Sequence, residues 1–101
     1  MPGFVFRLIA PRPTFAADMT DDERATMQAH VEYWTRRVEA GQVLAFGPVL
    51  DPTYPYGIGI IVVDDLAAAE ALRDGDPALG MPGFRAEIAP MPRLVTRDGT
   101  F

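Results

Sequence analysis

Four amino acid types are missing from this 101-residue chain, which contains no cysteine, no lysine, no serine and no asparagine. Without cysteine it can form no disulfide, no thiolate nucleophile and no zinc–thiolate site. Without lysine it can form neither a Schiff base nor the lysine clamp of a P-loop, and without serine it cannot build a serine triad. The missing residues therefore exclude the commonest routes to covalent catalysis.

The ionisable groups that remain are of few kinds. There are 14 carboxylates, nine arginines, three tyrosines and one histidine, His30. One histidine cannot form a multi-histidine metal cluster, so we expect no metal site and no cofactor. Any chemistry then depends on proton transfer, for which histidine is the best-suited side chain at neutral pH.

Charge and hydropathy limit the classes of partner. The formal net charge is −5 and the arginines are scattered, so the chain lacks the basic patch that binds nucleic acid. No apolar run approaches the ~20 residues of a membrane span, and the N-terminal segment lacks signal-peptide features. We expect a cytoplasmic protein that binds neither nucleic acid nor membrane. One domain should span residues 1–95, with a tail over 96–101 that frays or packs on a neighbour.

Apolar segments separated by turn residues predict four strands and two helices. The expected elements are strand 4–10, a loop to Met19, helix 21–40, strand 42–50, strand 56–63, helix 66–73, a loop over 79–83 and strand 84–95. Pro90 and Pro92 interrupt the last strand, which suits an edge position. The β-α-β-β-α-β order predicts an α+β fold, a ferredoxin-like sandwich. Its four-stranded antiparallel sheet has the first and third strands in the centre and both helices on one face.

The first helix has clear start and stop signals. Thr20 and Glu23 form a capping-box pattern, and Gly41 is a good left-handed stop. The apolar stripe expected to face the sheet recurs at helical spacing and consists of Met27, Val31, Trp34 and Val38.

The predicted strands are apolar on both faces. In the third strand, Ile58, Ile60 and Val62 point one way, whereas Ile61 and Val63 point the other. The second strand likewise sets Leu44, Phe46 and Leu50 against Val43, Ala45 and Val49. Because two helices can cover only one face, we expect a second copy to bury the other face, which gives a homodimer packed sheet against sheet.

His30 is the candidate reactive group. It lies in the middle of the first helix, one turn from Met27 and Trp34, at the margin of the apolar stripe. One interpretation is a half-buried histidine bonded to backbone or water, and the other is a general acid or base oriented by a carboxylate. Asp76, before Pro77 at the end of the second helix, is the best-placed carboxylate, although aspartate before proline is also a common turn residue.

A small-molecule pocket beside His30 needs floor space and walls. Gly57 and Gly59 share one side of the third strand, which suits either close packing or an open pocket floor. Arg12, between two prolines, is either an anion-binding group or a solvated loop residue. Tyr54 is a further aromatic residue available as a wall. The candidate substrate-binding residues are Arg12, Phe15, Trp34, Tyr56 and Gly59.

Several short motifs, each weak alone, follow one another in a specific order. They are His30-Val31-Glu32-Tyr33-Trp34, Glu39-Ala40-Gly41, Phe46-Gly47-Pro48-Val49, Asp74-Gly75-Asp76-Pro77 and the closing strand Phe84–Met91. In this order the chain resembles the YciI-like (YCII-related) proteins over nearly its whole length. The opening Arg12-Pro13-Thr14-Phe15 with Met19-Thr20 resembles a subgroup with a longer first loop.

This resemblance implies a dimeric α+β barrel with a His–Asp pair as the active site, which corresponds here to His30 and Asp76. The characterised family example is a dehydrochlorinase acting on a chlorinated hydroxyquinol, which implies a small, aromatic or phenolic substrate. We therefore expect a homodimeric acid–base enzyme of lyase or isomerase type. The alternative is a non-catalytic small-molecule-binding or accessory dimer in which the pair is structural. A cofactor-free monooxygenase is a third class.

Overall fold

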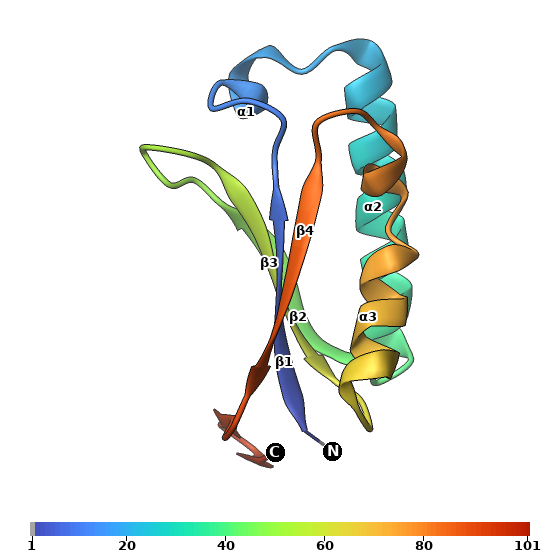
Figure 1. Ribbon diagram of the computed structural model, residues 1–101, viewed down its shortest axis with the longest axis vertical. Helices are drawn as coiled ribbons and strands as arrows, with labels where there is room; N and C mark the ends of the chain where they lie inside the picture. Colours follow the sequence, from blue (N-terminus) through green and yellow to red (C-terminus); the bar gives the residue numbers. More distant parts are fainter. Residues whose placement is uncertain (1) are drawn as a thin grey trace.

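Residues 2–101, which the computed structural model describes, form a four-stranded antiparallel sheet with its long helices on one face (Figure 1). The elements are β1 (Gly3–Ile9), α1 (Phe15–Asp18), α2 (Asp21–Glu39), β2 (Val43–Val49), β3 (Tyr56–Val62), α3 (Leu66–Asp74), the 3₁₀ helix η1 (Pro77–Gly80), β4 (Arg85–Met91), β5 (Val95–Thr96) and β6 (Gly99–Thr100). The sheet order is β2-β3-β1-β4, so β1 and β3 are central and β4 is an edge strand. The predicted ferredoxin-like α+β fold is confirmed.

Two short helices occupy connections that the sequence predicts as loops. The segment before Met19 contains α1, a single turn of four residues, and the segment after α3 contains η1, also of four residues. One turn is too short to show a periodic apolar pattern, and its nucleation is costly unless tertiary contacts support it. Both helices therefore depend on contacts that are distant in sequence.

The helix α2, with 19 residues, begins at the predicted capping box. The Thr20 hydroxyl oxygen accepts from the Glu23 backbone N–H at 3.1 Å, and the Glu23 carboxylate accepts from the Thr20 N–H at 2.9 Å. Gly41 follows the helix with a φ of +80°, a left-handed conformation that glycine adopts without steric cost. Among residues 2–101, no helix combines the length and the apolar character that crossing a bilayer requires.

The buried face of α2 differs from the predicted stripe. Trp34 is 1% exposed, but Val31 and Val38 are 49% and 37% exposed, while His30 and Glu23 are buried. Successive residues are about 100° apart around a helix, so His30 and Val31 lie on opposite sides of Trp34. Both buried polar groups have partners outside the sheet, since His30 bonds Asp76 at the start of η1 and Glu23 bonds Arg12 in the loop after β1. The predicted stripe is therefore confirmed at Met27 and Trp34 and wrong at Val31 and Val38.

Trp34 anchors α2 on the sheet. Its ring centroid lies 4.6 Å from that of Phe6 on β1, with the two planes tilted by 35°. Burying each large apolar side chain stabilises the fold by about 1.5–3 kcal/mol, so this contact fixes the middle of the helix. The buried cluster around it consists of Phe4, Phe6, Leu8, Trp34, Val43, Ile61, Val63, Ala69 and Ala78.

An irregularity in β2 changes the face that Val43 joins. Val43 pairs with Ile61, whereas Ala45 pairs with Ile60, so two steps along β2 match one step along β3. The extra residue, Leu44, is 40% exposed. The predicted grouping of Val43 with Ala45 is therefore wrong, because the bulge reverses the alternation and places Val43 in the core beneath the helices.

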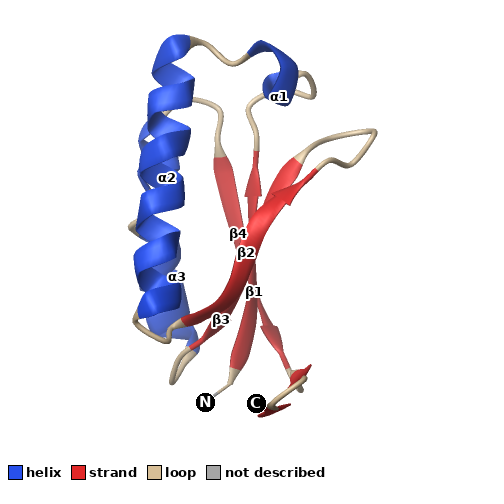
Figure 2. Ribbon diagram, turned by 180° about the vertical axis from the view of Figure 1, so that it is seen from behind, coloured by secondary structure: helices blue, strands red, loops and turns tan. Residues whose placement is uncertain are grey.

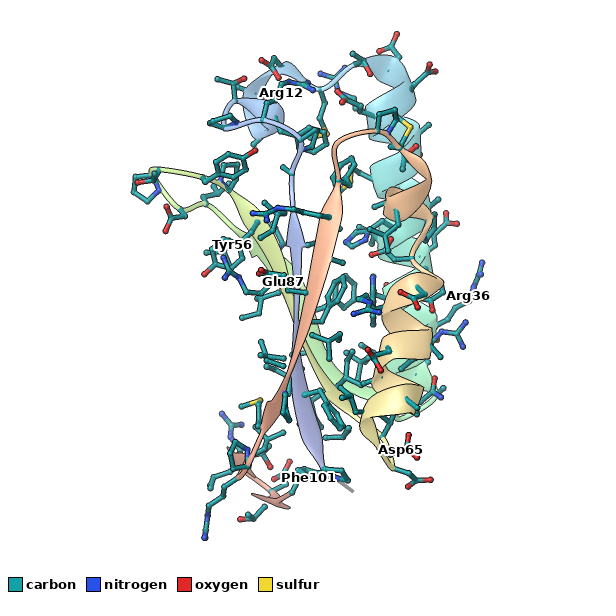
Figure 3. The ribbon with its side chains drawn as sticks, in the orientation of Figure 1. Arg12, Arg36, Tyr56, Asp65, Glu87 and Phe101 are labelled. Atoms are coloured by element: carbon teal, nitrogen blue, oxygen red, sulfur yellow. The ribbon has the colours of Figure 1, made fainter. Side chains whose placement is uncertain are left out.

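The sheet face opposite the helices carries apolar and charged side chains (Figure 3). Ile58 and Ile60 are half-buried on this face and Val62 is buried. Toward β1 and β4 the face becomes polar, with Arg7 and Glu87 paired at 3.5 Å. In the part of the chain that the structure describes, α2 and α3 both lie on the other side of the sheet (Figure 2).

The C-terminal residues form a hairpin rather than a frayed tail, and packing of this segment on a neighbour stays a prediction. Thr96 pairs with Gly99 across the β5–β6 ladder. Leu94 and Phe101 exchange two backbone hydrogen bonds of 3.0 and 2.7 Å. The turn between the strands is Arg97-Asp98, and Gly99 takes the fourth turn position, where glycine is favoured in the commonest type of β-turn.

Candidate functional site

His30 and Asp76 meet between α2 and η1. Nδ1 of His30 lies 2.8 Å from Oδ2 and 3.0 Å from Oδ1 of the carboxylate. The two residues are 7% and 3% exposed. The predicted pairing is present, and the imidazole is buried rather than half-buried.

The turn that ends α3 orients Asp76. Asp76 is the N-cap of η1, and its Oδ1 accepts from the Ala78 backbone N–H at 2.9 Å. Pro77 occupies the first helical position, where a missing N–H costs nothing. The backbone of this turn therefore holds the carboxylate independently of its contact with His30.

Trp34 supplies a third donor to the same carboxylate. Its Nε1–H donates to Oδ2 of Asp76 at 2.8 Å. Trp34 follows His30 by four residues, which places both side chains on one face of α2. The buried carboxylate therefore accepts from the imidazole, the indole and the Ala78 N–H, which satisfies the polar group without requiring solvent.

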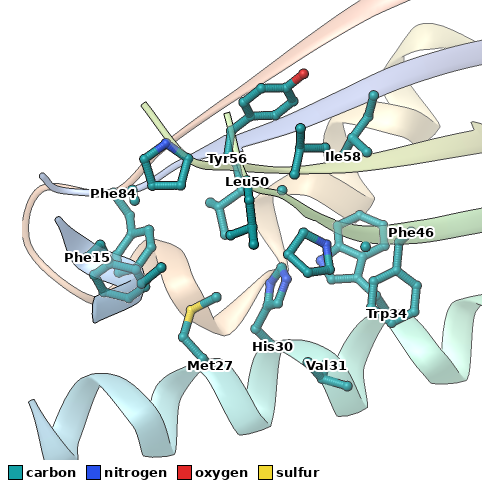
Figure 4. Close-up of a pocket in the computed structure, with 18 of the residues that line it drawn as sticks. Phe15, Met27, His30, Val31, Trp34, Phe46, Leu50, Tyr56, Ile58 and Phe84 are labelled. Atoms are coloured by element: carbon teal, nitrogen blue, oxygen red, sulfur yellow. The ribbon is translucent and has the colours of Figure 1, made fainter. Parts of the chain in front are cut away.

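These contacts assign the tautomer of His30. A carboxylate can only accept, so Nδ1 of the imidazole carries the hydrogen that faces Asp76. In the neutral ring, Nε2 is then the proton acceptor. The ring projects from α2 into a cavity (Figure 4), so the acceptor atom belongs to a site that a small molecule can enter.

The cavity has a volume of about 220 Å³ and lies between α2 and the sheet, beneath α1. Its aromatic walls are Phe15, Trp34, Phe46 and Phe84, and Met27, Val31 and Leu50 add aliphatic surface (Figure 4). Of the residues that line it within 2–101, only His30 and Tyr56 have ionisable side chains. The cavity is therefore apolar, with a single strong acid–base group on its wall.

Three of the predicted binding residues, Phe15, Trp34 and Tyr56, line this cavity. The Phe15 ring packs edge-on against Phe84, with a centroid distance of 5.2 Å and an interplanar angle of 85°. This contact joins α1 to the loop before β4. Aromatic pairs in this geometry contribute about 0.5–1.5 kcal/mol beyond their buried area.

Gly59 is not among the lining residues, whereas Gly57, two residues earlier on the same face, is. A Cβ atom at Gly59 would lie 3.6 Å from side-chain atoms of both Phe46 and Phe6. These two aromatic side chains cover the space that the missing side chain leaves. The predicted open floor is therefore at Gly57, and Gly59 serves close packing.

Tyr56 borders the cavity where β3 passes it, but its ring lies on the opposite face of the sheet. The register places Tyr56 opposite Ile9, and residues 7 and 9 of β1 alternate away from the inward-facing Phe6 and Leu8. The Arg7 guanidinium stacks on the Tyr56 ring, 4.5 Å from its centroid. The prediction that this ring forms a pocket wall is therefore corrected.

Arg12 lies outside the cavity lining, and its donors are engaged within the chain. Nη1 and Nη2 bond both carboxylate oxygens of Glu23 at 2.8 and 2.7 Å, and Nε bonds Asp18 at 2.7 Å. The Arg12 bonds, followed by the Thr20 N–H, lower the pKa of Glu23 to about 2, and the two carboxylates raise the pKa of Arg12. The predicted anion-binding role is not met, because two anionic side chains already occupy the guanidinium.

The site also contains three groups that the sequence did not predict, namely Phe46, Phe84 and the Ala78 N–H. Phe46 alternates onto the helix-covered face of its strand, which was a usable signal. The four-residue spacing of His30 and Trp34 likewise indicated a shared partner. Phe84 and Ala78 reach the site through irregular turns, for which the sequence pattern held no signal.

The chain also matches a known family. The sequence model described as YCII-related domain matches residues 4–91, a span that runs from β1 to the end of β4 and includes His30 and Asp76. The C-terminal hairpin lies outside the match. No curated protein matches the chain.

Proposed function

Because the chain belongs to the YCII-related domain family, we propose that it is an acid–base enzyme acting on a small aromatic or phenolic molecule, without a cofactor. The observation that carries this proposal is the buried His30–Asp76 pair, whose imidazole opens onto an apolar cavity. In this function Nε2 of His30 takes a proton from the substrate and returns one later in the cycle.

Asp76 positions the base and stabilises its charged form. Its hydrogen bond to Nδ1–H keeps Nε2 directed toward the cavity, and its negative charge favours the imidazolium that forms when Nε2 accepts a proton. Positioned proton transfer of this kind accelerates reactions by ~10²–10⁴-fold. This range suits elimination or isomerisation of an acidic small molecule.

The size and chemistry of the cavity favour a one-ring substrate. An apolar cavity of about 150 Å³ in another protein binds benzene, so about 220 Å³ accommodates a single ring with small substituents. A charged group elsewhere on the ligand would meet Phe15, Phe46 and Phe84 rather than a counter-ion, at a desolvation cost. The favoured substrate carries its one reactive proton donor beside His30 and is otherwise apolar.

A dehydrochlorination is the specific reaction that the family resemblance suggests. Loss of one proton and one chloride from a chlorinated hydroxyquinol gives a quinone without an oxidant. The proton shifts of this reaction require one base that also acts as an acid, and His30 can serve in both roles. Chlorinated hydroxyquinol is therefore the first compound to assay.

Ligand binding tests the proposed site without requiring turnover. Trp34 is the only tryptophan and His30 the only histidine, so Trp34 fluorescence and the His30 imidazole signals in NMR each report one residue. We expect 4-chlorophenol to shift both signals. Benzoate, of similar size but charged, should bind about tenfold more weakly or worse, because its carboxylate finds no partner in the apolar wall.

Benzoate is the matched control for this titration. Binding of 4-chlorophenol without a change at His30, or equal binding of benzoate, contradicts the proposed site. No response to 4-chlorophenol or to chlorinated hydroxyquinol rejects the proposed substrate class.

One observation favours a second function, that of a non-catalytic binding or accessory protein. Asp76 also accepts from Trp34 and Ala78, so the carboxylate links α2 to η1 whether or not His30 reacts. In this alternative the His–Asp bond is one more structural contact. The two functions differ in what loss of His30 does to turnover, an outcome that stability measurements alone do not reveal.

We also propose that the functional unit is a homodimer joined through the sheet faces opposite the helices. The support is the partly buried apolar surface of Ile58 and Ile60, which a single chain leaves without a covering layer in the described residues. Sedimentation equilibrium at micromolar concentration should give about twice the 11.1 kDa of one chain. Ile60→Asp should shift the mass toward the monomer, whereas Val31→Asp, on the helix layer, should not. A wild-type mass of one chain rejects the dimer.

A further inference from the structure

We propose that Arg12 is a positioning residue that holds α1 as a roof over one end of the His30 cavity and so limits which molecules reach the base. This inference rests on the proposed function in so far as the cavity is a substrate site. It assigns to Arg12 a role through other residues, without contact to the ligand.

The roof is the segment from Pro11 to Met19. Phe15, Ala16 and Met19 of this segment line the cavity. α1 lies beyond the end of β1 (Figure 1). Phe15 is 5% exposed and packs edge-on against Phe84. Displacement of α1 would therefore open the cavity directly above Met27 and His30.

α1 has little stability of its own. It is one turn long, and its N-cap residue, Thr14, makes no side-chain capping bond to the helix backbone. A single helical turn costs more conformational entropy than its hydrogen bonds return. The closed position of α1 must therefore be maintained by contacts outside the turn.

Arg12 provides those contacts (Figure 3). Four hydrogen bonds leave its guanidinium, two to the Glu23 carboxylate, one to the Asp18 carboxylate at 2.7 Å and one to the Asp18 carbonyl oxygen at 2.9 Å. The two Asp18 acceptors belong to the last residue of α1. The guanidinium also lies 5.3 Å from the centre of the Phe15 ring, on the roof itself.

The Arg12 hydrogen bonds join Asp18 of α1 to Glu23 of α2, and we call this set of contacts the clasp. Its Glu23 end is rigid. Glu23 is fixed by the capping box at the start of α2, where its Oε1 accepts from the Thr20 N–H as well as from Arg12. Its side chain is 11% exposed, so the pair is better shielded from water than an ordinary surface ion pair. Arg12 therefore ties the short, weak turn to the first turn of the longest helix.

The geometry also argues against two simpler roles. An anion-binding arginine keeps donors free, whereas four of the five N–H groups of Arg12 are used within the chain. A solvated surface arginine is not held in a two-bond fork to a fixed carboxylate. What remains is a mechanical connection between α2 and the roof.

Collisional quenching of Trp34 by acrylamide tests the roof directly, because Trp34 lines the cavity and is 1% exposed. Loss of a charge-assisted hydrogen-bond fork should increase the open population, and we expect the quenching constant of Arg12→Ala to rise by about 3–10-fold. The dissociation rate of 4-chlorophenol should rise by a similar factor. Arg12→Lys, which keeps the charge but not the fork, should recover only part of the difference.

The matched control is Arg24→Ala, which removes an exposed arginine whose ion pair with Asp21 spans 3.5 Å on the same end of α2. It should leave the quenching constant at the wild-type value. If Arg12→Ala does not fold, Asp18→Asn decides the matter, because it weakens the α1 end of the clasp and leaves the capping box intact. Wild-type quenching in the folded Arg12→Ala or Asp18→Asn variant overturns the proposal. Quenching requires neither ligand nor turnover, so a missing enzymatic activity does not affect this outcome.

Discussion

Replacement of Asp76 by alanine is expected to lower the free energy of unfolding by about 3–5 kcal/mol. The substitution leaves three buried donors without a partner, namely Nδ1–H of His30, Nε1–H of Trp34 and the Ala78 N–H. Each unsatisfied donor costs about 1–3 kcal/mol, and their shared location makes the costs less than additive. Small domains have only about 5–15 kcal/mol of stability, so the variant should be close to unfolding at room temperature.

Urea unfolding followed by circular dichroism measures this effect. Asp74→Ala is the matched control, since Asp74 lies two residues away with a 64% exposed side chain and an ion pair to Arg73. Such exposed pairs are worth about 0–1 kcal/mol, so its unfolding midpoint should hardly change. Asp76→Asn keeps an acceptor oxygen but adds donors, and should be intermediate. Equal stability of Asp76→Ala and Asp74→Ala would show that the carboxylate does not organise the turn.

Loss of the base should remove catalysis while the cavity remains. His30→Gln is expected to reduce kcat/KM for chlorinated hydroxyquinol by about 10²–10⁴-fold, the usual contribution of positioned acid–base catalysis. Glutamine retains an N–H donor for Asp76, so the variant separates proton transfer from the structural bond. Chloride release and the ultraviolet absorbance of the quinone both measure the rate.

The control for His30→Gln is Met27→Leu, a change of similar volume on the same wall, one helical turn away. It should change kcat/KM by much less than His30→Gln. An active His30→Gln enzyme would eliminate His30 as the base. If the wild-type protein turns over none of the phenols or hydroxyquinols, and the two site residues couple only in a stability double-mutant cycle, the accessory function is the better account.

The sequence predicted the parts of the fold that depend on local patterns. The capping box at Thr20 and Glu23 predicted the start of α2, and the apolar run over residues 56–63 predicted β3. The pairing of His30 with Asp76 followed from the scarcity of reactive groups and from the family resemblance. Each of these features depends on residue types that have few alternative structural or chemical roles.

The structural features that the sequence did not predict depend on contacts between distant segments. Nothing in the apolar pattern indicated that Val31 would be exposed and His30 buried, because that rotation of α2 depends on a carboxylate 46 residues further along. The bulge at Leu44 and the inward turn of α1 likewise depend on neighbours across the fold. The prolines beside Arg12 predict a stiff loop but not its partner, because the capping-box pattern accounts for Glu23 without Arg12.

The His–Asp contact can form only after both halves of the chain are present. His30 comes from the first β-α-β half and Asp76 from the second, and neither half contains both members of the pair. Such a distant contact requires closure of a long chain loop, which local helix formation does not require. During synthesis, a chain that ends before η1 would carry an unpaired imidazole and no oriented base. The proposed acid–base pair therefore assembles only once both halves have docked, and neither an incomplete nor a partly unfolded chain can form it.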